Sequence, residues 1–261
     1  MMRSLLTAAT GMDAQQVTID TIANNLANVN TVAFKQSRAN FHDLLYQTLK
    51  APGQSSTTGT VVPSGIQIGA GTRVSSVEKV FQHGSTRITE RPFDLQIEGE
   101  GFYRIQKDDG GVAYTRAGNF QIDNTGRLVN NAGFPLIPEI TIPQNIPHDR
   151  VSVGMDGVVS IRDGEKSEVI GQLDLAMFVN PAGLDSLGHN LYGATVSSGE
   201  PIIGKPGQDD FGRIAQGQLE NSNVNIVEEM VNMITGQRAY EINSKVIQTG
   251  DQMLQQTVNI R

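Results

Sequence analysis

The chain has 261 residues, enough for two compact units, and a net charge of −7 with only 20 basic residues, which are scattered singly. This charge pattern offers no basic surface to a phosphate backbone, so nucleic acid is excluded as a partner. The absence of cysteine rules out disulfides, thiolate metal sites and cysteine nucleophiles. The 28 glycines, the 10 prolines and the lack of tryptophan favour a turn-rich β region joined to helices over a large enzyme core.

No segment has the pattern of a secretory signal peptide or of a membrane span. Residues 1–11 contain a single arginine and no long apolar core, and the polar residues Asp13, Gln15 and Gln16 follow soon after. No stretch approaches the roughly 18 apolar residues of a transmembrane helix. If the protein works outside the cytosol, we therefore expect another export route to carry it.

Residues 1–34 are predicted to form an N-terminal helix with an apolar stripe that repeats every seven residues. A period of seven is the coiled-coil repeat. Only Arg3, Asp13 and Asp20 carry charge in this segment, so we expect the helix to contact neighbours on most of its sides. The stripe consists of Leu5, Met12, Ile19 and Leu26, with Ile22 on the neighbouring ridge.

The middle of the chain is predicted to contain an arm and a β domain. Residues 35–75 form a linker and an extended arm, because the run from Thr48 to Gly71 is rich in serine, threonine, glycine and proline. Residues 76–215 form a central all-β domain. From Phe93 to Glu98 apolar and polar residues alternate, which predicts a half-buried strand, and turn clusters then recur every 8 to 12 residues or so.

Residues 216–261 are predicted to form a C-terminal helix. Asn225 is its expected N-cap, and Glu228, three residues later, can close a capping box. This helix also has a stripe with a period of seven: Ile226, Met233, Tyr240, Ile247 and Leu254.

The two stripes together predict an α+β fold in which the N- and C-terminal helices pair as a coiled-coil layer, beside the central all-β domain and the extended arm. The alternative is that each helix packs on the protein's own β domain, which would need no oligomer. We favour self-association, because the nearly uncharged N-terminal helix would otherwise leave amide side chains facing water.

No residue pattern indicates catalysis, and we expect no catalytic residue, cofactor or metal. The histidines at positions 42, 83, 148 and 189 stand alone, without a second ligand at helical spacing. Glu98 and Glu100 flank a glycine, so a secreted enzyme that acts on polysaccharide is an alternative. We favour a solvated turn at this position, because the two carboxylates lie in a Gly-X-Gly bend.

Three groups of segments resemble the bacterial flagellar rod and hook proteins. Residues 20–35 are similar to the N-terminal signature of that family, and residues 220–234 and 237–245 to its C-terminal signature. Residues 99–102, 114–120 and 123–129 resemble the repeats of its β domain. The signature residues are Asn24, Asn25, Asn28, Phe34, Asn223, Asn225, Gln237 and Arg238.

Within the family, the arm resembles an insertion that is found in distal rod subunits. The similar segments are residues 43–48 and the arm through residues 63–69, and the arm residues Tyr46, Pro52 and Pro63 are expected to contact a neighbouring subunit. Another axial subunit, from the proximal rod or the hook, is the alternative within this family.

The resemblance implies a structural protein that polymerises into a rigid helical tube. The terminal helices would form an inner layer around the export channel, the β domain would form the outer wall, and the tube would transmit motor torque. The expected location is the periplasm-spanning rod of the basal body, reached through the flagellar type III export apparatus. The expected partners are further copies of the chain, proximal rod proteins, the hook protein, the P and L rings and the rod cap protein.

Overall fold

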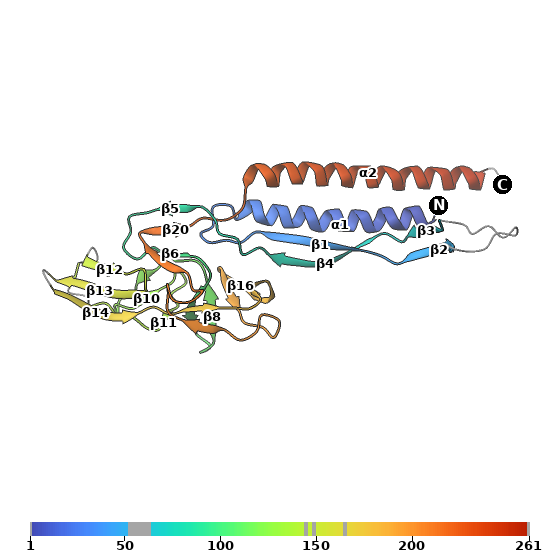
Figure 1. Ribbon diagram of the computed structural model, residues 1–261. Helices are drawn as coiled ribbons and strands as arrows, with labels where there is room; N and C mark the ends of the chain where they lie inside the picture. Colours follow the sequence, from blue (N-terminus) through green and yellow to red (C-terminus); the bar gives the residue numbers. More distant parts are fainter. Residues whose placement is uncertain (1, 52–63, 144–145, 148–149, 164–165, 260–261) are drawn as a thin grey trace. The chain divides into compact units, whose positions relative to one another are not determined.

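The computed structural model describes residues 2–51, 64–143, 146–147, 150–163 and 166–259. One long helix begins the chain, a second ends it, and the residues between them are rich in β-strands (Figure 1). The predicted α+β class is therefore confirmed. The two helices are α1, Met2–Ala27, and α2, Ile226–Asn259.

The chain divides into two compact units. The first combines residues 1–26, 37–78 and 225–261, so both long helices belong to it. The second combines residues 27–36 and 79–224 and holds most of the strands.

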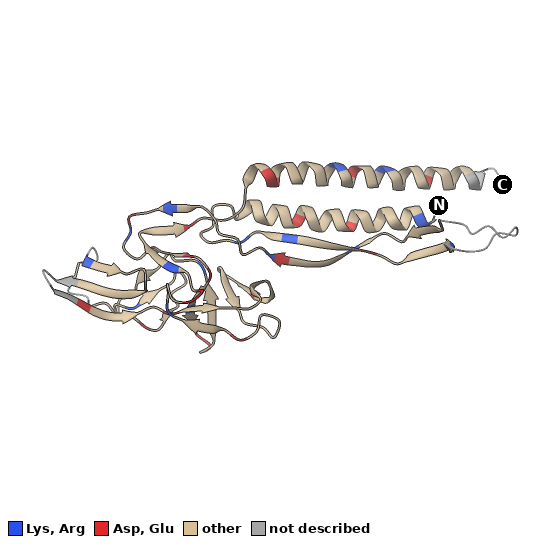
Figure 2. Ribbon diagram, viewed as in Figure 1, with Lys and Arg blue, Asp and Glu red and all other residues tan. Residues whose placement is uncertain are grey.

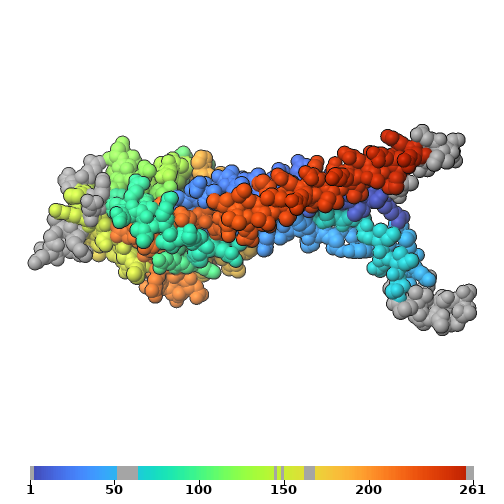
Figure 3. Space-filling model, turned by 90° about the horizontal axis from the view of Figure 1, so that it is seen from above, coloured from blue at the N-terminus to red at the C-terminus, as the bar shows by residue number. Residues whose placement is uncertain are grey.

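In the first unit, α1 and α2 lie side by side (Figures 1 and 3). The N-cap predicted for α2 is confirmed, because the Val227 N–H donates to Asn225 Oδ1 over 3.1 Å. Glu228 and Glu229 lie in the first turn, where the helix dipole favours negative charge. The strands of this unit form two pairs. β1, Ser37–Asp43, pairs with β4, Thr72–Lys79. β2, Tyr46–Lys50, pairs antiparallel with β3, Ile66–Gly69.

The second unit contains a seven-stranded sheet, a three-stranded sheet and several strand pairs. The large sheet has the order β16 (Asp185–Gly188), β17 (Leu191–Gly193), β8 (Val112–Thr115), β7 (Phe102–Gln106), β15 (Leu175–Met177) and β18 (Ile202–Gly204), with β11 (Leu136–Ile137) also paired to β7. The three-stranded sheet consists of β12 (Val151–Val153), β13 (Val158–Asp163) and β14 (Lys166–Gln172). The pairs are β5 (Thr86–Ile88) with β20 (Gln218–Glu220), β6 (Leu95–Glu98) with β19 (Arg213–Gln216), and β9 (Gln121–Ile122) with β10 (Leu128–Val129).

The strand predicted from alternation is β6, and its environment differs from the prediction. Leu95 and Ile97 are buried, as expected, but Asp94 and Gln96 are buried as well. The Gln96 side chain is covered by the neighbouring β5, where its Nε2 donates to Thr86 Oγ1 over 2.9 Å. Polar residues in an alternating strand can therefore face a second layer of the same unit instead of solvent.

Candidate self-assembly site

The two long helices meet along an antiparallel seam in the first unit. At the end of α1, Asn25 Nδ2 donates to Glu229 Oε2 of α2 over 3.3 Å. Further along, Ile19 lies against Gly236, and near the start of α1, Leu5 lies against Gly250. On α2 the contact positions recur every seven residues, at 229, 236, 243 and 250.

Glycines let the two helices approach each other closely at this seam. A Cβ added at Gly250 would lie 2.7 Å from Leu5 Cδ2, closer than carbon atoms normally approach. A Cβ at Gly236 would lie 3.4 Å from Ile19 Cγ1, in ordinary contact. On the other helix, Gly11 faces the side chain of Asn243. These glycines therefore provide room for side chains of the opposite helix, at the cost of about 1 kcal/mol each in helix propensity.

The predicted stripe of α2 lies beside this seam. Each stripe residue from Ile226 to Ile247 lies three residues before one of the contact positions. Two stripe residues are exposed, Ile226 to 46% and Tyr240 to 40%. Met233, Ile247 and Leu254 are half-buried. On α1, Ile22 is buried, and the other stripe residues, Leu5, Met12, Ile19 and Leu26, are half-buried.

A second apolar row on α2 is exposed to solvent. Its first three turns carry Ile226, Val227, Met230, Val231 and Ile234, with Val227 exposed to 71%. Figure 2 shows charged residues along α2, among them Glu228 and Glu229 in its first turn, but the residues of this row are uncharged. Apolar side chains in such a continuous row on one element indicate a surface that another chain covers.

Asn25, one of the signature residues, connects three elements of the first unit. It is buried, its Nδ2 donates to the Ser37 carbonyl over 2.9 Å, and its Oδ1 accepts from the Ser37 N–H over 2.8 Å. The same Nδ2 also reaches Glu229. One buried amide thus fixes the end of α1 against both β1 and α2.

Two further signature residues hold the connecting segments of the second unit. Asn223 Oδ1 accepts from the Gln36 N–H over 2.7 Å, and its Nδ2 donates to the Val80 carbonyl over 2.9 Å. Phe34 is buried, with Lys79 Nζ 4.4 Å from its ring centroid. The remaining signature residues lie at the surface or partly so: Asn24, Gln237 and Arg238 are exposed, and Asn28 is half-buried.

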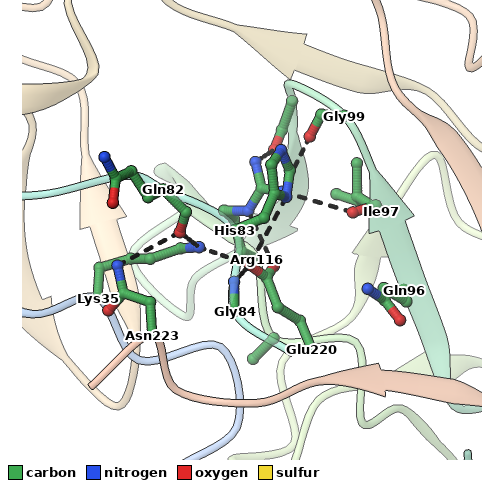
Figure 4. Close-up of polar contacts among 12 residues, drawn as sticks. Lys35, Gln82, His83, Gly84, Gln96, Ile97, Gly99, Arg116, Glu220 and Asn223 are labelled. Atoms are coloured by element: carbon green, nitrogen blue, oxygen red, sulfur yellow. Dashed lines mark hydrogen bonds and ion pairs between the residues drawn. The ribbon is translucent and has the colours of Figure 1, made fainter. Parts of the chain in front are cut away.

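A buried ionic cluster lies in the second unit (Figure 4). Lys35 Nζ is 2.6 Å from Glu220 Oε1, and Arg116 Nε donates to Glu220 Oε2 over 3.1 Å. The exposed fractions of the three side chains are 0% for Lys35, 1% for Glu220 and 3% for Arg116. His83 Nδ1 lies 3.1 Å from Arg116 Nη2, at the margin of the cluster.

Hydrogen bonds to the main chain complete the cluster. Lys35 Nζ donates to the Gln82 carbonyl over 2.6 Å, and the Gly84 N–H donates to Glu220 Oε1 over 3.0 Å. Arg116 donates to the carbonyls of Gly99 and Gly101 over 2.9 Å and 3.0 Å. The cluster therefore joins the segment after α1, the bend after β6 and strand β20 inside one unit, with its buried charges paired.

The buried position changes the acidity of the cluster. Burial, and then the nearby Arg116, lower the pKa of Lys35 to about 8, although Glu220 acts in the opposite direction. Burial would raise the pKa of Glu220, but the charges of Arg116 and Lys35 outweigh it, and the pKa is lowered. Burial and Arg116 also lower the pKa of His83.

Sequence reasoning did not single out this cluster. Lys35, Arg116 and Glu220 are each inside a segment that resembles the flagellar family, but their separation of many residues gives no spacing signal. A lone lysine or arginine beside apolar residues is normally taken as a surface side chain. Only the fold brings the three charges together.

Of the predicted arm residues, Tyr46 lies in the described part of the chain. It begins β2, is 56% exposed, and follows Leu45, which is 90% exposed. All five residues of β2 are exposed. Pro52 and Pro63 lie outside the described residues.

The next feature is the placement of the histidines and of the Glu98–Glu100 pair in the described part of the chain. In these ranges, no three His, Asp or Glu side chains gather to hold a metal ion. Glu98 and Glu100 are both exposed, on either side of Gly99, whose φ is 116°. His42 and His189 are exposed, and His148 lies outside the described residues. In the described part of the chain, no helix is long and apolar enough to cross a membrane.

Three family models match segments of the chain. "Flagella basal body rod protein" matches residues 5–35, and "Flagellar hook protein FlgE/F/G D1 domain" matches residues 96–161. "Flagellar basal body rod FlgEFG protein C-terminal" matches residues 215–260. The matched segments include most of both helices and part of the β region.

Individual proteins match the chain over nearly its full length. It is 51% identical over 257 residues to the flagellar basal-body rod protein FlgG of Buchnera aphidicola subsp. Schizaphis graminum, with 98% of each chain covered. It is 48% identical to the FlgG of Borreliella burgdorferi, with 97% of each chain covered. The FlgG of Caulobacter vibrioides is 45% identical, with 100% of each chain covered.

Proposed function

Because the chain belongs to the flagellar basal-body rod protein family, as a structural subunit of the distal rod, we propose that it polymerises into a rigid helical tube. This tube transmits motor torque to the hook and encloses the export channel. The exposed apolar row on α2, beginning at Ile226 and Val227, carries the proposal, because polymerisation would remove it from water.

The parts of the chain take different positions in this proposed tube. The helices α1 and α2, within residues 1–34 and 216–261, form the inner layer as a coiled coil, and residues 76–215 form the outer wall. The close seam at Gly236 and Gly250 supports pairing of the terminal helices within one copy. The stripe beside it and the exposed row are then available to helices of other copies.

Residues 35–75 act as an arm that wedges between neighbouring subunits and stiffens the tube. The exposure of Tyr46 and of all five residues of β2 supports this role, and the arm prolines Pro52 and Pro63 belong to the same segment. Contacts between unlike surfaces of successive copies allow growth to continue without closure into a ring.

The proposed partners follow from this position in the basal body. They are the proximal rod proteins below, the hook protein above, the P and L rings around the rod, the rod cap protein at the growing tip and the flagellar type III export apparatus. The chain reaches the periplasm through that apparatus. It performs no catalysis in this role.

Electron microscopy of basal bodies tests the proposal. Basal bodies are isolated from the source bacterium with this gene deleted and from the complemented strain. We expect the deletion strain to have rods that stop below the outer rings and lack hooks, and complementation to restore both. Complete rods with hooks in the deletion strain would contradict the proposed function.

A further inference from the structure

The second unit contains a cavity of about 680 Å³ that the proposed function does not use. It lies between the segment after α1, the turn after β10 and the tight turn between β16 and β17. Its walls carry neither an acidic side chain nor a lysine or arginine, and His189 is the one ring side chain among the lining residues. Five asparagines contribute to the lining: Asn28, Asn119, Asn130, Asn131 and Asn190.

Hydrogen bonds hold these walls in place. Asn190 Nδ2 donates to the Val32 carbonyl over 2.9 Å, and Thr115 Oγ1 donates to the Asn190 carbonyl over 2.7 Å. Asn130 Oδ1 accepts from the N–H groups of Ala132 and Phe134 over 3.0 Å and 2.9 Å. Asn190 Oδ1 and Asn130 Nδ2 have no hydrogen-bond partner among the described residues. A preformed site thus offers both an acceptor and a donor.

The lining determines which ligand chemistry fits. A charged ligand would be poorly accommodated, because a charge that enters without a counter-charge loses its hydration. Apart from the imidazole of His189, the lining offers no ring on which a sugar could stack. Amide side chains donate and accept, as the peptide main chain does, and serve as adaptable contacts at protein interfaces. An uncharged peptide with hydroxyl and amide side chains fits best.

The chain itself contains a segment of this kind. From Ala51 to Thr72 no charged residue occurs, and no other uncharged run in the sequence is as long. Serine, threonine, glutamine and glycine make up most of it. At Ile66 the run enters β3, which pairs with β2, so residues 51–65 connect these two strands.

We propose that the asparagine-lined cavity of one copy binds residues 51–65 of a second copy, the part of the uncharged segment that connects β2 to β3. This inference rests on the proposed self-assembly and adds the receiving site for the arm. Binding pairs Asn190 Oδ1 and Asn130 Nδ2 with the incoming main chain. Since the cavity and the segment are different surfaces, each copy contacts one neighbour through its cavity and another through its arm.

A disulfide between copies tests the proposal in a chain that has no cysteine of its own. Asn131→Cys, in the cavity lining, is combined with Thr57→Cys, and basal bodies from the strain are oxidised with diamide. On a non-reducing gel we expect dimers and higher oligomers. The control pair Asp108→Cys with Thr57→Cys places the first thiol on an exposed turn outside the cavity, and we expect it to remain monomeric.

The outcomes separate this inference from the proposed function. Complete rods with hooks but no disulfide oligomers would overturn the inference alone, whereas complete rods in the gene deletion would overturn the function. A disulfide within one copy, seen as a shifted monomer, would also overturn the inference. If the first pair of substitutions stops rod growth, Ala132→Cys is combined with Ser64→Cys, and disulfide formation between copies is measured at these two positions instead.

A second measurement needs no assembled rod. A synthetic peptide of residues 51–65 is added to the full-length chain, and NMR follows the side-chain amides of Asn119, Asn130 and Asn190. We expect shifts that saturate with peptide and disappear with Asn130→Asp. If the peptide shifts none of these amide signals, the proposal is overturned. It is also overturned if an N-acetylglucosamine tetramer shifts them and the peptide does not.

Discussion

At the scale of single residues, the stability of the second unit depends on the buried ionic cluster of Lys35, Arg116 and Glu220. Lys35 and Arg116 share one carboxylate, Glu220, and none of the three side chains is more than 3% exposed. Removal of one partner from such a cluster leaves a buried charge without its counter-ion. Both cations therefore depend on the single carboxylate of Glu220, and the carbonyls of Gln82, Gly99 and Gly101 accept further N–H groups of Lys35 and Arg116.

We expect Glu220→Gln to destabilise the second unit by about 3 to 5 kcal/mol, the usual range for breaking a buried ion pair. Lys35 and Arg116 would then remain buried without a negative charge. Urea unfolding followed by circular dichroism measures the effect. The matched control is Glu78→Gln, which removes the exposed Arg38–Glu78 pair, with side chains 64% and 32% exposed. This exposed pair is screened by water, so the control should cost far less than Glu220→Gln, and equal effects would contradict the prediction.

The same cluster predicts a loss of stability in acid. The folded-state pKa of His83 lies below 6.5, so the unfolded chain binds more protons and the free energy of unfolding decreases as pH falls through 6.5. Glu220 adds a further loss below pH 4.5, because its folded-state pKa is also lowered. The measurement is the Tm between pH 8 and pH 4.

His83→Gln separates the two contributions. It keeps a side-chain acceptor for Arg116 without a titrating ring, so the decrease in Tm near pH 6.5 should shrink while the decrease below pH 4.5 remains. His42→Gln, on β1, replaces an exposed histidine outside the cluster and should leave the profile unchanged. If the Tm of His83→Gln depends on pH in the same way as that of the unchanged protein, His83 does not cause the loss of stability near pH 6.5.

At the scale of elements, the helix pair depends on small residues at a few positions. Where Gly250 faces Leu5, a larger residue has no space unless the helices separate or Leu5 moves. Where Asn25 and Glu229 meet, a polar contact fixes the other end of the seam. The seam thus specifies which faces of α1 and α2 remain available for other chains.

We expect Gly250→Val to weaken the helix pair by about 1 to 3 kcal/mol, the usual cost of overpacking. Hydrogen exchange of the α1 and α2 amides measures the change. Thr249→Val places the same β-branched side chain at the adjacent exposed position and is the matched control. Unchanged protection in Gly250→Val would show that Leu5 can move aside without cost.

Tyr240→Asp tests the role of the α2 stripe in assembly. Tyr240 is 40% exposed, so the variant should leave the folded units intact. Burial of its unpaired carboxylate between copies would be unfavourable, so rods should not form. Circular dichroism checks folding, and electron microscopy of basal bodies checks assembly. Gln252→Asp, which adds the same charge at an exposed position outside the stripe, should still assemble, and normal rods from Tyr240→Asp would refute the prediction.

At the scale of the whole molecule, the arm can be shortened without disturbing its described base. Lys50 of β2 pairs with Ile66 of β3, so deletion of residues 51–63 leaves Ser64 and Gly65 as a two-residue connection. Two-residue loops that contain glycine are common in antiparallel hairpins. The deletion therefore removes the uncharged tip and keeps the strand pair.

We expect rods built from this deletion variant to bend more than rods of the unchanged protein, because contacts between neighbouring copies are lost. Curvature measured in images of isolated basal bodies gives the result. A second variant replaces residues 51–63 by a glycine-serine segment of equal length, and it separates the loss of length from the loss of specific contacts. Equal curvature in all three proteins would count against a stiffening arm.

The sequence alone was sufficient for the fold class and the family. The period-seven stripes predicted the terminal helices, Asn225 predicted the start of α2, and the signatures around Asn25 and Asn223 identified the flagellar family. Each of these signals is local, because it is set by residues that lie within a few turns of one another.

The tertiary structure alone decided which side chains meet over long separations. It placed Gly236 and Gly250 in the helix seam and gathered Lys35, Arg116 and Glu220 in one cluster. It also buried Gln96, which lies on the polar face of a strand predicted to be half-buried. No periodicity links such residues, since their contacts depend on how distant segments pack. A charged or small side chain has the same local pattern at the surface as in a core, and only packing determines whether it is paired, buried or free.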